Sequence, residues 1–453
     1  MNILWIYVED LSPWLPAWGD STIATPNIDR LVARGSAYIN CFSNSPVCSP
    51  SRSGTITGCY PTRIGSHHHV CSRPGEPKLS LPKNIRTLPE LFRDAGYFTY
   101  NLGKDDYNFD YDRNELYHGD YETPGFYGHH HKGTVPFDIV NREWTYWRRR
   151  KPGQFFFGQI GLWGGKNSRA VPNPIDPAGM HLPDYYPDIP QFREEFARHY
   201  ECIQIVDQEV GKIIHALETD KLLDETCVFF FSDHGMGSLR HKQFCYDGGT
   251  HIPLILSLPN GENVGQSNHQ LISSIDIAAT SLALAGLSIP KWMDGRDFLS
   301  PEYPREYVVS ARDRCDYTID HIRSIRTPNF RYIRNFLTDR PLMQPQYRDQ
   351  TETYLAYRKM FQDGELTAIQ AAFAGDERPA EELYDHQNDS DESHNLVNDP
   401  AYATILDTMR SHLEKWIEET GDLGAIPESS EQLTALIDRW GKERCVNPEY
   451  QTV

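Results

Sequence analysis

Five short apolar segments in the first two-thirds of the chain have the composition of buried β-strands. Each is almost continuously apolar instead of alternating with polar residues, which is typical of strands covered on both faces of a largely parallel sheet. We expect these strands at residues 2–8, 97–102, 155–162, 226–231 and 252–258.

Helix signals alternate with these strands. Thr25 and Pro26 have the residue types that begin a helix, and Gly35 is predicted to end it. Thr87 and Gly96 bracket a second helix in the same way. Further helices are expected at residues 191–219 and 275–285. This alternation predicts an α/β fold with a large doubly wound, mostly parallel sheet, whose active site lies at the carboxyl ends of the strands.

The pattern changes after about residue 310. Segments 322–327 and 331–336 flank a Pro-Asn pair and predict a hairpin. A polar helix at 351–373, a strand at 382–385 and a last amphipathic helix at 401–420 follow. We therefore expect two parts: an α/β domain at residues 1–310, and a smaller α+β subdomain with a small antiparallel sheet and a terminal helix at 311–453.

Composition excludes several classes of function. The formal net charge of −19 argues against a nucleic-acid-binding protein, because phosphate binding needs a high density of Lys and Arg. No apolar run approaches the roughly 20 residues that span a bilayer. The N-terminus lacks the features of a signal peptide, so the location stays open: periplasmic or secreted if a signal peptide was removed, otherwise cytoplasmic.

The chain has nine cysteines, with no Cys-x-x-Cys pair and no regular spacing. This excludes a scaffold built on disulfides, although one or two disulfides remain compatible with the count. Most of these cysteines are expected to be small buried hydrophobic residues.

Cys48 opens the most informative segment, Cys48-Ser-Pro-Ser-Arg52-Ser-Gly. It resembles the signature of the formylglycine-dependent sulfatase family. The resemblance implies that a formylglycine-generating maturation enzyme oxidises Cys48 to formylglycine, whose hydrated aldehyde attacks sulfur. Arg52 and the amides of a helix N-terminus would stabilise the anions. The alternative is a buried free cysteine before a Pro-Ser turn.

Acidic residues follow two of the predicted strands. Glu9 and Asp10 come directly after the first, and Asp233 and His234 come after the strand at 226–231. Since parallel strands end at the same edge, these residues and Cys48 should form one metal site, and carboxylates there favour Ca²⁺. The family has Asp where this chain has Glu9. The alternative is a pair of turn-capping residues.

Basic residues complete the resemblance. Lys104 and Lys242 match the two active-site lysines of the family and, with Arg52, would bind the sulfate. Asp106 and Lys166 stand where the family has histidines, so the proton donor is open between Lys166, His241 and the histidine run at 65–69. We expect the remaining candidates to contact substrate: His67, His69, Asp106, Arg312 and Asp313. The histidine run could equally be a polar loop, and Arg312 and Asp313 an exposed salt-bridge cluster.

Four further segments, at 23–31, 182–190, 311–314 and 382–385, resemble the branch of the family that includes heparan N-sulfatase and many bacterial glycan sulfatases. The resemblance implies a sulfated oligosaccharide substrate, bound at its end in a pocket, and leaves O-sulfate and N-sulfate both open. The long loop at 103–141 is expected to shape the site. Two alternatives remain: a phosphodiesterase or phosphonate monoester hydrolase of the same superfamily, and a non-catalytic protein that binds sulfated glycans.

Overall fold

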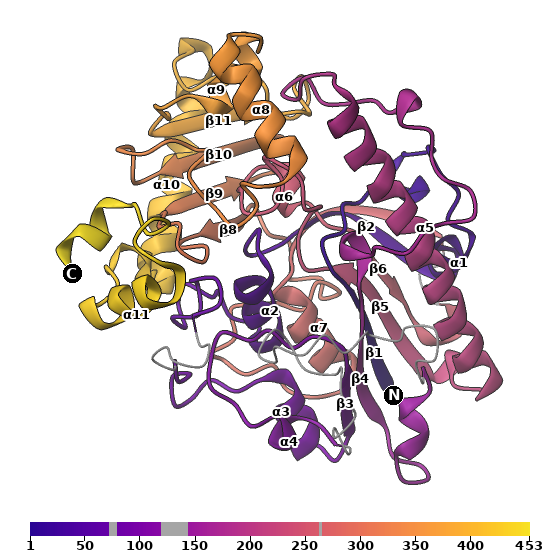
Figure 1. The fold of residues 1–453 in the computed structure, drawn as a ribbon. Helices are drawn as coiled ribbons and strands as arrows, with labels where there is room; N and C mark the ends of the chain where they lie inside the picture. Colours follow the sequence, from indigo (N-terminus) through magenta and orange to yellow (C-terminus); the bar gives the residue numbers. More distant parts are fainter. Residues whose placement is uncertain (72–78, 119–143, 262–264) are drawn as a thin grey trace.

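A seven-stranded sheet forms the centre of the larger part of the molecule (Figure 1). This computed structural model describes residues 1–71, 79–118, 144–261 and 265–453. The strand order is β3-β4-β1-β5-β6-β2-β7, and every neighbouring pair is parallel except those that involve β6. The strands are β1 (Asn2–Val8), β2 (Gly35–Phe42), β3 (Phe98–Leu102), β4 (Phe156–Leu162), β5 (Thr226–Ser232), β6 (Leu254–Ser257) and β7 (Gln266–Ser273).

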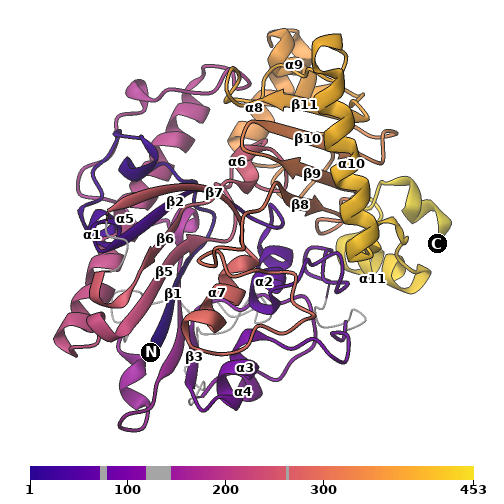
Figure 2. The ribbon, with the colours of Figure 1, turned by 180° about the vertical axis from the view of Figure 1, so that it is seen from behind.

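Helices cover both faces of this sheet (Figures 1 and 2). Successive side chains of a strand point to opposite faces. Leu4, Ile6 and Val8 of β1 therefore join one core, and Ile3 and Trp5 join the other. The first core contains α1 (Pro26–Ala33) and α5 (Pro190–Thr219), and the second contains α2 (Cys48–Thr57), α3 (Leu88–Asp94) and α7 (Asp276–Leu284).

The two edge strands of the large sheet are protected in different ways. Next to β3, the backbone N–H of His118 donates to the Thr99 carbonyl at 2.7 Å, and the Thr99 N–H donates to the His118 ring. At the other edge, the first half of β7 is polar and largely exposed, with the sequence Gln-Ser-Asn-His-Gln. A short helix, α4 (Arg113–Leu116), precedes the segment that pairs with β3.

A four-stranded antiparallel sheet of order β11-β10-β9-β8 forms the smaller part. One face packs on α10 in a core that includes Ile325, Leu383 and Trp416. Ile333 and Tyr384 belong to the same continuous core as the large sheet, so the two parts pack together. The elements of the smaller part are β8 (Val308–Arg312), β9 (Ile322–Arg326), β10 (Phe330–Asn335), β11 (Glu381–Asp385), α8 (Glu352–Asp363), α9 (Ala368–Ala374), α10 (Ala403–Thr420) and α11 (Ser430–Trp440). The short helix α6 (Asp247–Thr250) belongs to the larger part, between β5 and β6.

The predicted fold class is confirmed, and several local predictions are wrong. Gly35 does not end α1; it begins β2, where a Cβ would lie 2.0 Å from the Leu256 carbonyl oxygen. The predicted helix at 351–373 is two helices, because Gly364 adopts a φ of 73° that ends α8. The helix at 401–420 is not the last, since α11 follows it.

Strands β2, β7 and β8 mix polar with apolar residues and were not predicted, although β8 is wholly buried. The predicted domain boundary at residue 310 falls inside β8, and the two-domain division stays a prediction. All nine cysteines are free thiols, eight of them buried. No helix in the described residues is long and apolar enough to cross a membrane.

Glu195 of α5 generates a prediction about stability and pH. Burial raises the pKa of its carboxyl from 4.5 to about 7. The protonated Glu195 carboxyl therefore makes its full contribution to the unfolding free energy below about pH 4.5, and this contribution is lost as the pH rises through about 7. Between about pH 5 and about pH 8, the wild type should lose about 2–3 kcal/mol of unfolding free energy relative to Glu195→Gln.

Urea unfolding at the two pH values measures this difference. The exposed neighbour Glu194 provides the matched control, since Glu194→Gln should follow the wild type. Parallel pH profiles for the wild type and Glu195→Gln would show that the carboxyl has no raised pKa.

Candidate functional site

Four adjacent parallel strands deliver charged residues to one edge of the large sheet. Asp10 follows β1, Asp233 follows β5, Lys166 follows β4 and Lys104 follows β3. Because β3, β4, β1 and β5 are neighbours in the sheet, these residues converge although they span about half of the chain. The backbone N–H of Asp10 donates to Asp233 Oδ1 at 2.9 Å, which fixes the two strand ends to each other.

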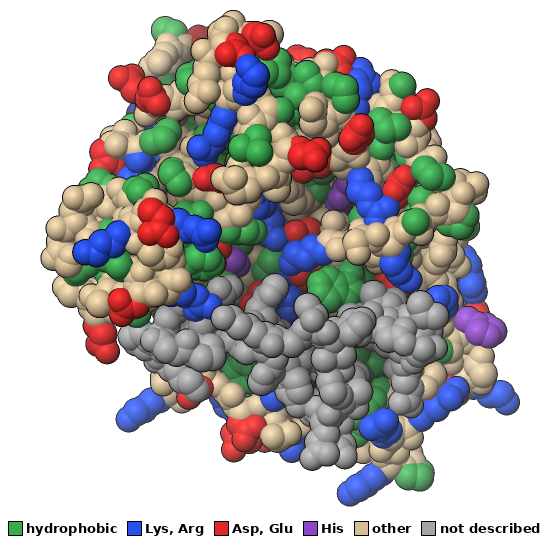
Figure 3. Space-filling model, viewed as in Figure 1, with side chains coloured by type: hydrophobic (Ala, Val, Ile, Leu, Met, Phe, Trp, Pro, Cys, Tyr) green, Lys and Arg blue, Asp and Glu red, His purple; other side chains and the backbone are tan. Residues whose placement is uncertain are grey.

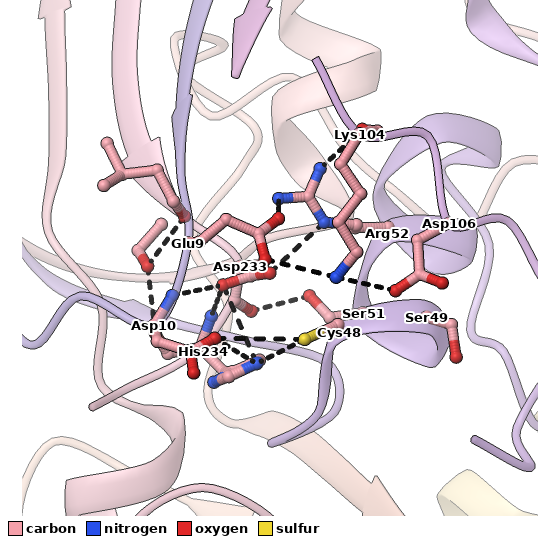
Figure 4. A network of polar contacts seen from close by, with 12 residues as sticks. Glu9, Asp10, Cys48, Ser49, Ser51, Arg52, Lys104, Asp106, Asp233 and His234 are labelled. Atoms are coloured by element: carbon pink, nitrogen blue, oxygen red, sulfur yellow. Dashed lines mark hydrogen bonds and ion pairs between the residues drawn. The ribbon is translucent and has the colours of Figure 1, made fainter. Parts of the chain in front are cut away.

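Cys48 lies in the first turn of α2, beside these strand ends (Figure 4). Its Sγ is 3.2 Å from His234 Nε2, 3.4 Å from Lys166 Nζ and 3.9 Å from Asp10 Oδ1. Burial alone would raise the pKa of the Cys48 thiol, but Lys104, Lys166, Lys242 and His234 lower it to about 6. The position is therefore one that stabilises a negative charge.

The α2 helix is unusual because all ten of its residues are buried and most of them are polar. Its hydroxyl groups are satisfied within the helix: Ser53, Thr55 and Thr57 donate to the carbonyl groups four residues earlier. Ser51 instead donates to the Asp233 carbonyl at 2.6 Å. This bond fixes the first turn of the helix to the end of β5.

Four residues form a group that could hold a metal ion. Ligand atoms of Asp10, Cys48, Asp233 and His234 all lie within 4.8 Å of one another. The Nδ1 atom of His234 is 2.8 Å from the Gly235 carbonyl and donates to it, so Nε2 faces the group. Burial alone would lower the pKa of His234, but Asp233 and Asp10 raise it above the ordinary value.

Glu9, predicted as a metal ligand, is surrounded by cations. Its carboxylate contacts Arg52 and Lys166, and its Oε2 lies 3.1 Å from Lys104 Nζ. It does not belong to the group of four above, and its role as a ligand stays a prediction. Although burial opposes ionisation, these three cations hold the pKa of Glu9 well below its usual range.

Lys104, Lys242 and Arg52 all pair with carboxylates of this cluster (Figure 4 for Arg52 and Lys104). Lys242 Nζ is 2.7 Å from Asp10 Oδ2, and Arg52 Nε is 3.2 Å from Asp233 Oδ2. Figure 3 shows a hollow near the middle of one face of the molecule, with basic and acidic side chains at its floor. Four cationic side chains, all buried or nearly buried, therefore lie together in an acidic protein, and carboxylates balance their charges. They are Arg52, Lys104, Lys166 and Lys242.

The other predicted residues take different positions. Asp106 Oδ2 lies 2.8 Å from Lys104 Nζ and holds that lysine. His241 Nε2 is 3.0 Å from the Tyr185 hydroxyl, and its ring packs among aromatic rings, where burial lowers its pKa to about 3. Among the described residues, His241 makes no contact with Cys48 that would support its predicted role as a proton donor.

Arg312 and Asp313 are buried, so they are not an exposed salt-bridge cluster. Arg312 lies over the Phe244 ring at 4.7 Å, and Asp313 Oδ1 is 3.1 Å from Arg323. His67 packs on His68 with ring centroids 4.2 Å apart. The substrate contacts of Arg312, Asp313 and His67 stay predictions. The part of the loop from 119 to 141 lies outside the described residues.

His69 takes partners that the sequence did not indicate. Its Nδ1 is 3.1 Å from Asp316 Oδ2, and its ring stacks on Tyr347 with a centroid distance of 6.4 Å. Arg52 similarly packs on Tyr7, 4.2 Å from the ring centroid. Asp316 and Tyr347 come from the smaller part of the chain and have no motif, so no sequence signal pointed to them.

Comparisons with known proteins show the family to which the sequence is similar. The profile of the Sulfatase family matches residues 1–287. An ulvan-active sulfatase of Formosa agariphila is 31% identical over 477 residues, which cover 94% of this chain and 76% of that protein. The human N-sulphoglucosamine sulphohydrolase is 26% identical, and the match covers 93% of this chain and 90% of that protein.

Solved structures show the same fold. A 2-O GAG sulfatase superposes with a TM-score of 0.67 at 20% identity, over 96% of each chain. A phosphonate monoester hydrolase from Silicibacter pomeroyi gives a TM-score of 0.68 at 18% identity, over 93% of this chain and 96% of its own. At these identities the similarity shows the fold alone.

Gly165 generates a prediction about how the site is supported. A Cβ at this position would lie 2.3 Å from the Asp10 carbonyl oxygen, while the Gly165 N–H donates to the Glu9 carbonyl at 2.9 Å. Gly165→Ala should therefore displace the end of β1 and lower the unfolding free energy by about 1–3 kcal/mol in urea. Gly179→Ala is the control, since its Cβ meets nothing within 4 Å. Equal stability of the two variants would contradict this packing.

Proposed function

The chain belongs to the sulfatase family and is a sulfuric ester hydrolase, and we propose that it removes sulfate from a sulfated carbohydrate with a formylglycine at position 48 and a bound Ca²⁺. The observation that carries the proposal is the position of Cys48. It lies in the first turn of a buried helix, within 4.8 Å of two carboxylates and a histidine, and beside a ring of cations.

The residues present fit both groups. Oxidation of Cys48 replaces its sulfur by oxygen, and an oxygen beside the carboxylates of Asp10 and Asp233 is the type of ligand that Ca²⁺ prefers. His234 is a softer ligand, but its Nε2 already faces the group. The formylglycine would supply the nucleophilic oxygen, and the ion would stabilise negative charge on the sulfate.

The basic side chains of the site would bind the sulfate and stabilise its negative charge. Lys104, Lys166 and Lys242 surround Cys48 and would contact sulfate oxygens. Arg52, held by Glu9 and Asp233, keeps its guanidinium fixed beside the nucleophile. Preorganised charges of this kind stabilise a transition state without reorganising during the reaction. They also explain how a protein of net charge −19 binds an anion, because the cations act locally.

The sugar class rests on the relatives. Proteins named for ulvan, N-acetylgalactosamine-6-sulfate and N-sulphoglucosamine are among those similar to this chain. They support a sulfated glycan as substrate and leave the sugar and the O- or N-sulfate open. A maturation enzyme that makes formylglycine would have to reach Cys48 before folding is complete, because α2 is wholly buried.

Cys48→Ala should abolish turnover and leave the fold intact. We expect sulfate release to fall by at least about 10³-fold, because the variant has no nucleophile. Ion chromatography of sulfate measures this on N-sulfoglucosamine, galactosamine-6-sulfate and ulvan oligosaccharides. Cys202→Ala, at a buried cysteine of α5, is the control for cavity effects.

Mass spectrometry of the peptide that contains residue 48 completes this test. Active wild-type enzyme should carry an aldehyde in place of the thiol. Sulfate release by an enzyme with an unmodified Cys48, or by Cys48→Ala, would refute the mechanism. Hydrolysis of a phosphonate monoester without any sulfate release would favour the phosphonate hydrolase alternative, and binding without turnover would favour the non-catalytic alternative.

Asp10→Asn should weaken metal binding and catalysis together. The variant removes one negative ligand, so the Kd for Ca²⁺ measured by titration calorimetry should rise by about tenfold or more. Sulfate release at limiting Ca²⁺ should fall in parallel. The exposed Asp224 supplies the control variant Asp224→Asn. Full activity of the wild type after exhaustive chelation would contradict the role of the metal.

A further inference from the structure

The leaving-group side of the site lacks the histidines that the chemistry would ordinarily use. Sulfate transfer from a sugar leaves a basic oxygen or nitrogen, which needs a proton as the bond to sulfur breaks. Lys166 occupies one of the positions where the sequence departs from the family signature. Its contacts, however, are Glu9, Asp10 and Cys48, so it lies on the side of the metal group. His241 bonds to Tyr185 instead.

We propose that His69, oriented by Asp316, donates the proton to the leaving group. This inference rests on the proposed sulfatase function and assigns a catalytic residue to it. The geometry of the pair suits a proton donor, because His69 Nδ1 is 3.1 Å from Asp316 Oδ2 and no protein hydrogen bond in the described residues uses Nε2. A carboxylate on Nδ1 fixes the orientation of the ring and leaves Nε2 as the atom that can face the leaving group.

A backbone hydrogen bond ties the segment that carries His69 to helix α2, which carries Cys48. The N–H of Val70 donates to Ser49 Oγ at 2.8 Å, and Ser49 follows Cys48 in the chain. Figure 4 shows Ser49 on the side of Cys48 away from Asp10 and His234. His69 is therefore tied to the first turn of α2 on the side opposite the metal group.

Next to His69, the protein is open to solvent at Tyr347. Its side chain is 40% exposed and stacks on the His69 ring. Burial raises the pKa of the Tyr347 hydroxyl, and Lys242, Cys48 and Asp316 are among the groups whose charges act on it.

The pair is also held rigidly. Arg314 donates to the Asp316 carbonyl at 2.6 Å and pairs with Glu428 at 2.7 Å. The His69 N–H donates to the Arg314 carbonyl at 2.8 Å. Asp316 adopts a φ of 53°, in the left-handed region that costs a non-glycine residue energy. These contacts maintain a conformation that sets the carboxylate against the imidazole.

The proposed step moves the sulfur group from the sugar to residue 48 and one proton from His69 to the sugar. The bond between sulfur and the bridging atom of the sugar breaks, and its electron pair goes to the bridging atom. That atom takes the Nε2 proton of the His69 imidazolium, which becomes a neutral imidazole, while sulfur bonds to the nucleophilic oxygen at residue 48 and that oxygen gives up its own proton to solvent. The imidazole regains a proton from water before the next turnover.

Leaving-group dependence tests the proposal. His69→Gln should lower kcat/KM by about 10²-fold or more on the sugar sulfate that the wild type hydrolyses fastest. On 4-nitrophenyl sulfate, whose phenolate leaves without a proton, the loss should stay within about threefold. Asp316→Asn should show the same selectivity with a smaller loss, and Asn tolerates the left-handed φ. His68→Gln, a neighbouring histidine beside Glu428, is the matched control and should affect both substrates alike.

Binding provides a readout independent of turnover. The same sugar sulfate is titrated by calorimetry into the inactive Cys48→Ala variant and into the double variant Cys48→Ala/His69→Gln. The two Kd values should agree within about threefold. Equal losses on both substrates, a rise in Kd that accounts for the loss, or unchanged activity on the sugar sulfate would each overturn the proposal. A wild-type enzyme that releases no sulfate from any substrate would instead overturn the proposed function.

Discussion

The site depends on the parallel register of four strands. β1 pairs with β4 on one side and β5 on the other, and β4 pairs with β3, so all four strands end at the same edge. A single-residue slip in this register would turn every side chain of a strand to the other face of the sheet. The separate cores on the two faces of β1 make such a slip costly, and they thereby fix the positions of the charged residues beyond the strand ends.

Charge balance is the second constraint, because the site confines several cations in a space that excludes most water. Glu9 is the residue that makes this possible, since one buried carboxylate contacts Arg52, Lys104 and Lys166. Removing one partner from a buried ion pair commonly costs about 3–5 kcal/mol, because the other charge is left without compensation. The Glu9 side chain is long enough to contact all three of these cations at once.

The sequence was sufficient to predict the fold class and the members of the central cluster. Apolar strands followed directly by charged residues predict a site at strand ends, and the Cys48 motif predicts that this cysteine lies among them, as it does. The sequence could not show that Glu9 faces cations, because pairing across four strands has no local pattern. Asp316 and Tyr347 were missed for the same reason: they come from another part of the chain and reach the site only through packing. Strands β2 and β7 were missed because their mixed polarity resembles that of loops.

The edges of the large sheet have a consequence for the behaviour of the protein at high concentration. An unpaired strand edge offers its amides and carbonyls to a second chain and promotes aggregation. Here the backbone around His118 already occupies the side of β3, and the outer half of β7 presents polar side chains to water. Association of copies through a shared β-sheet is disfavoured at both ends, so contacts between molecules would have to use side-chain surfaces that leave the sheet, and the site at its edge, undisturbed.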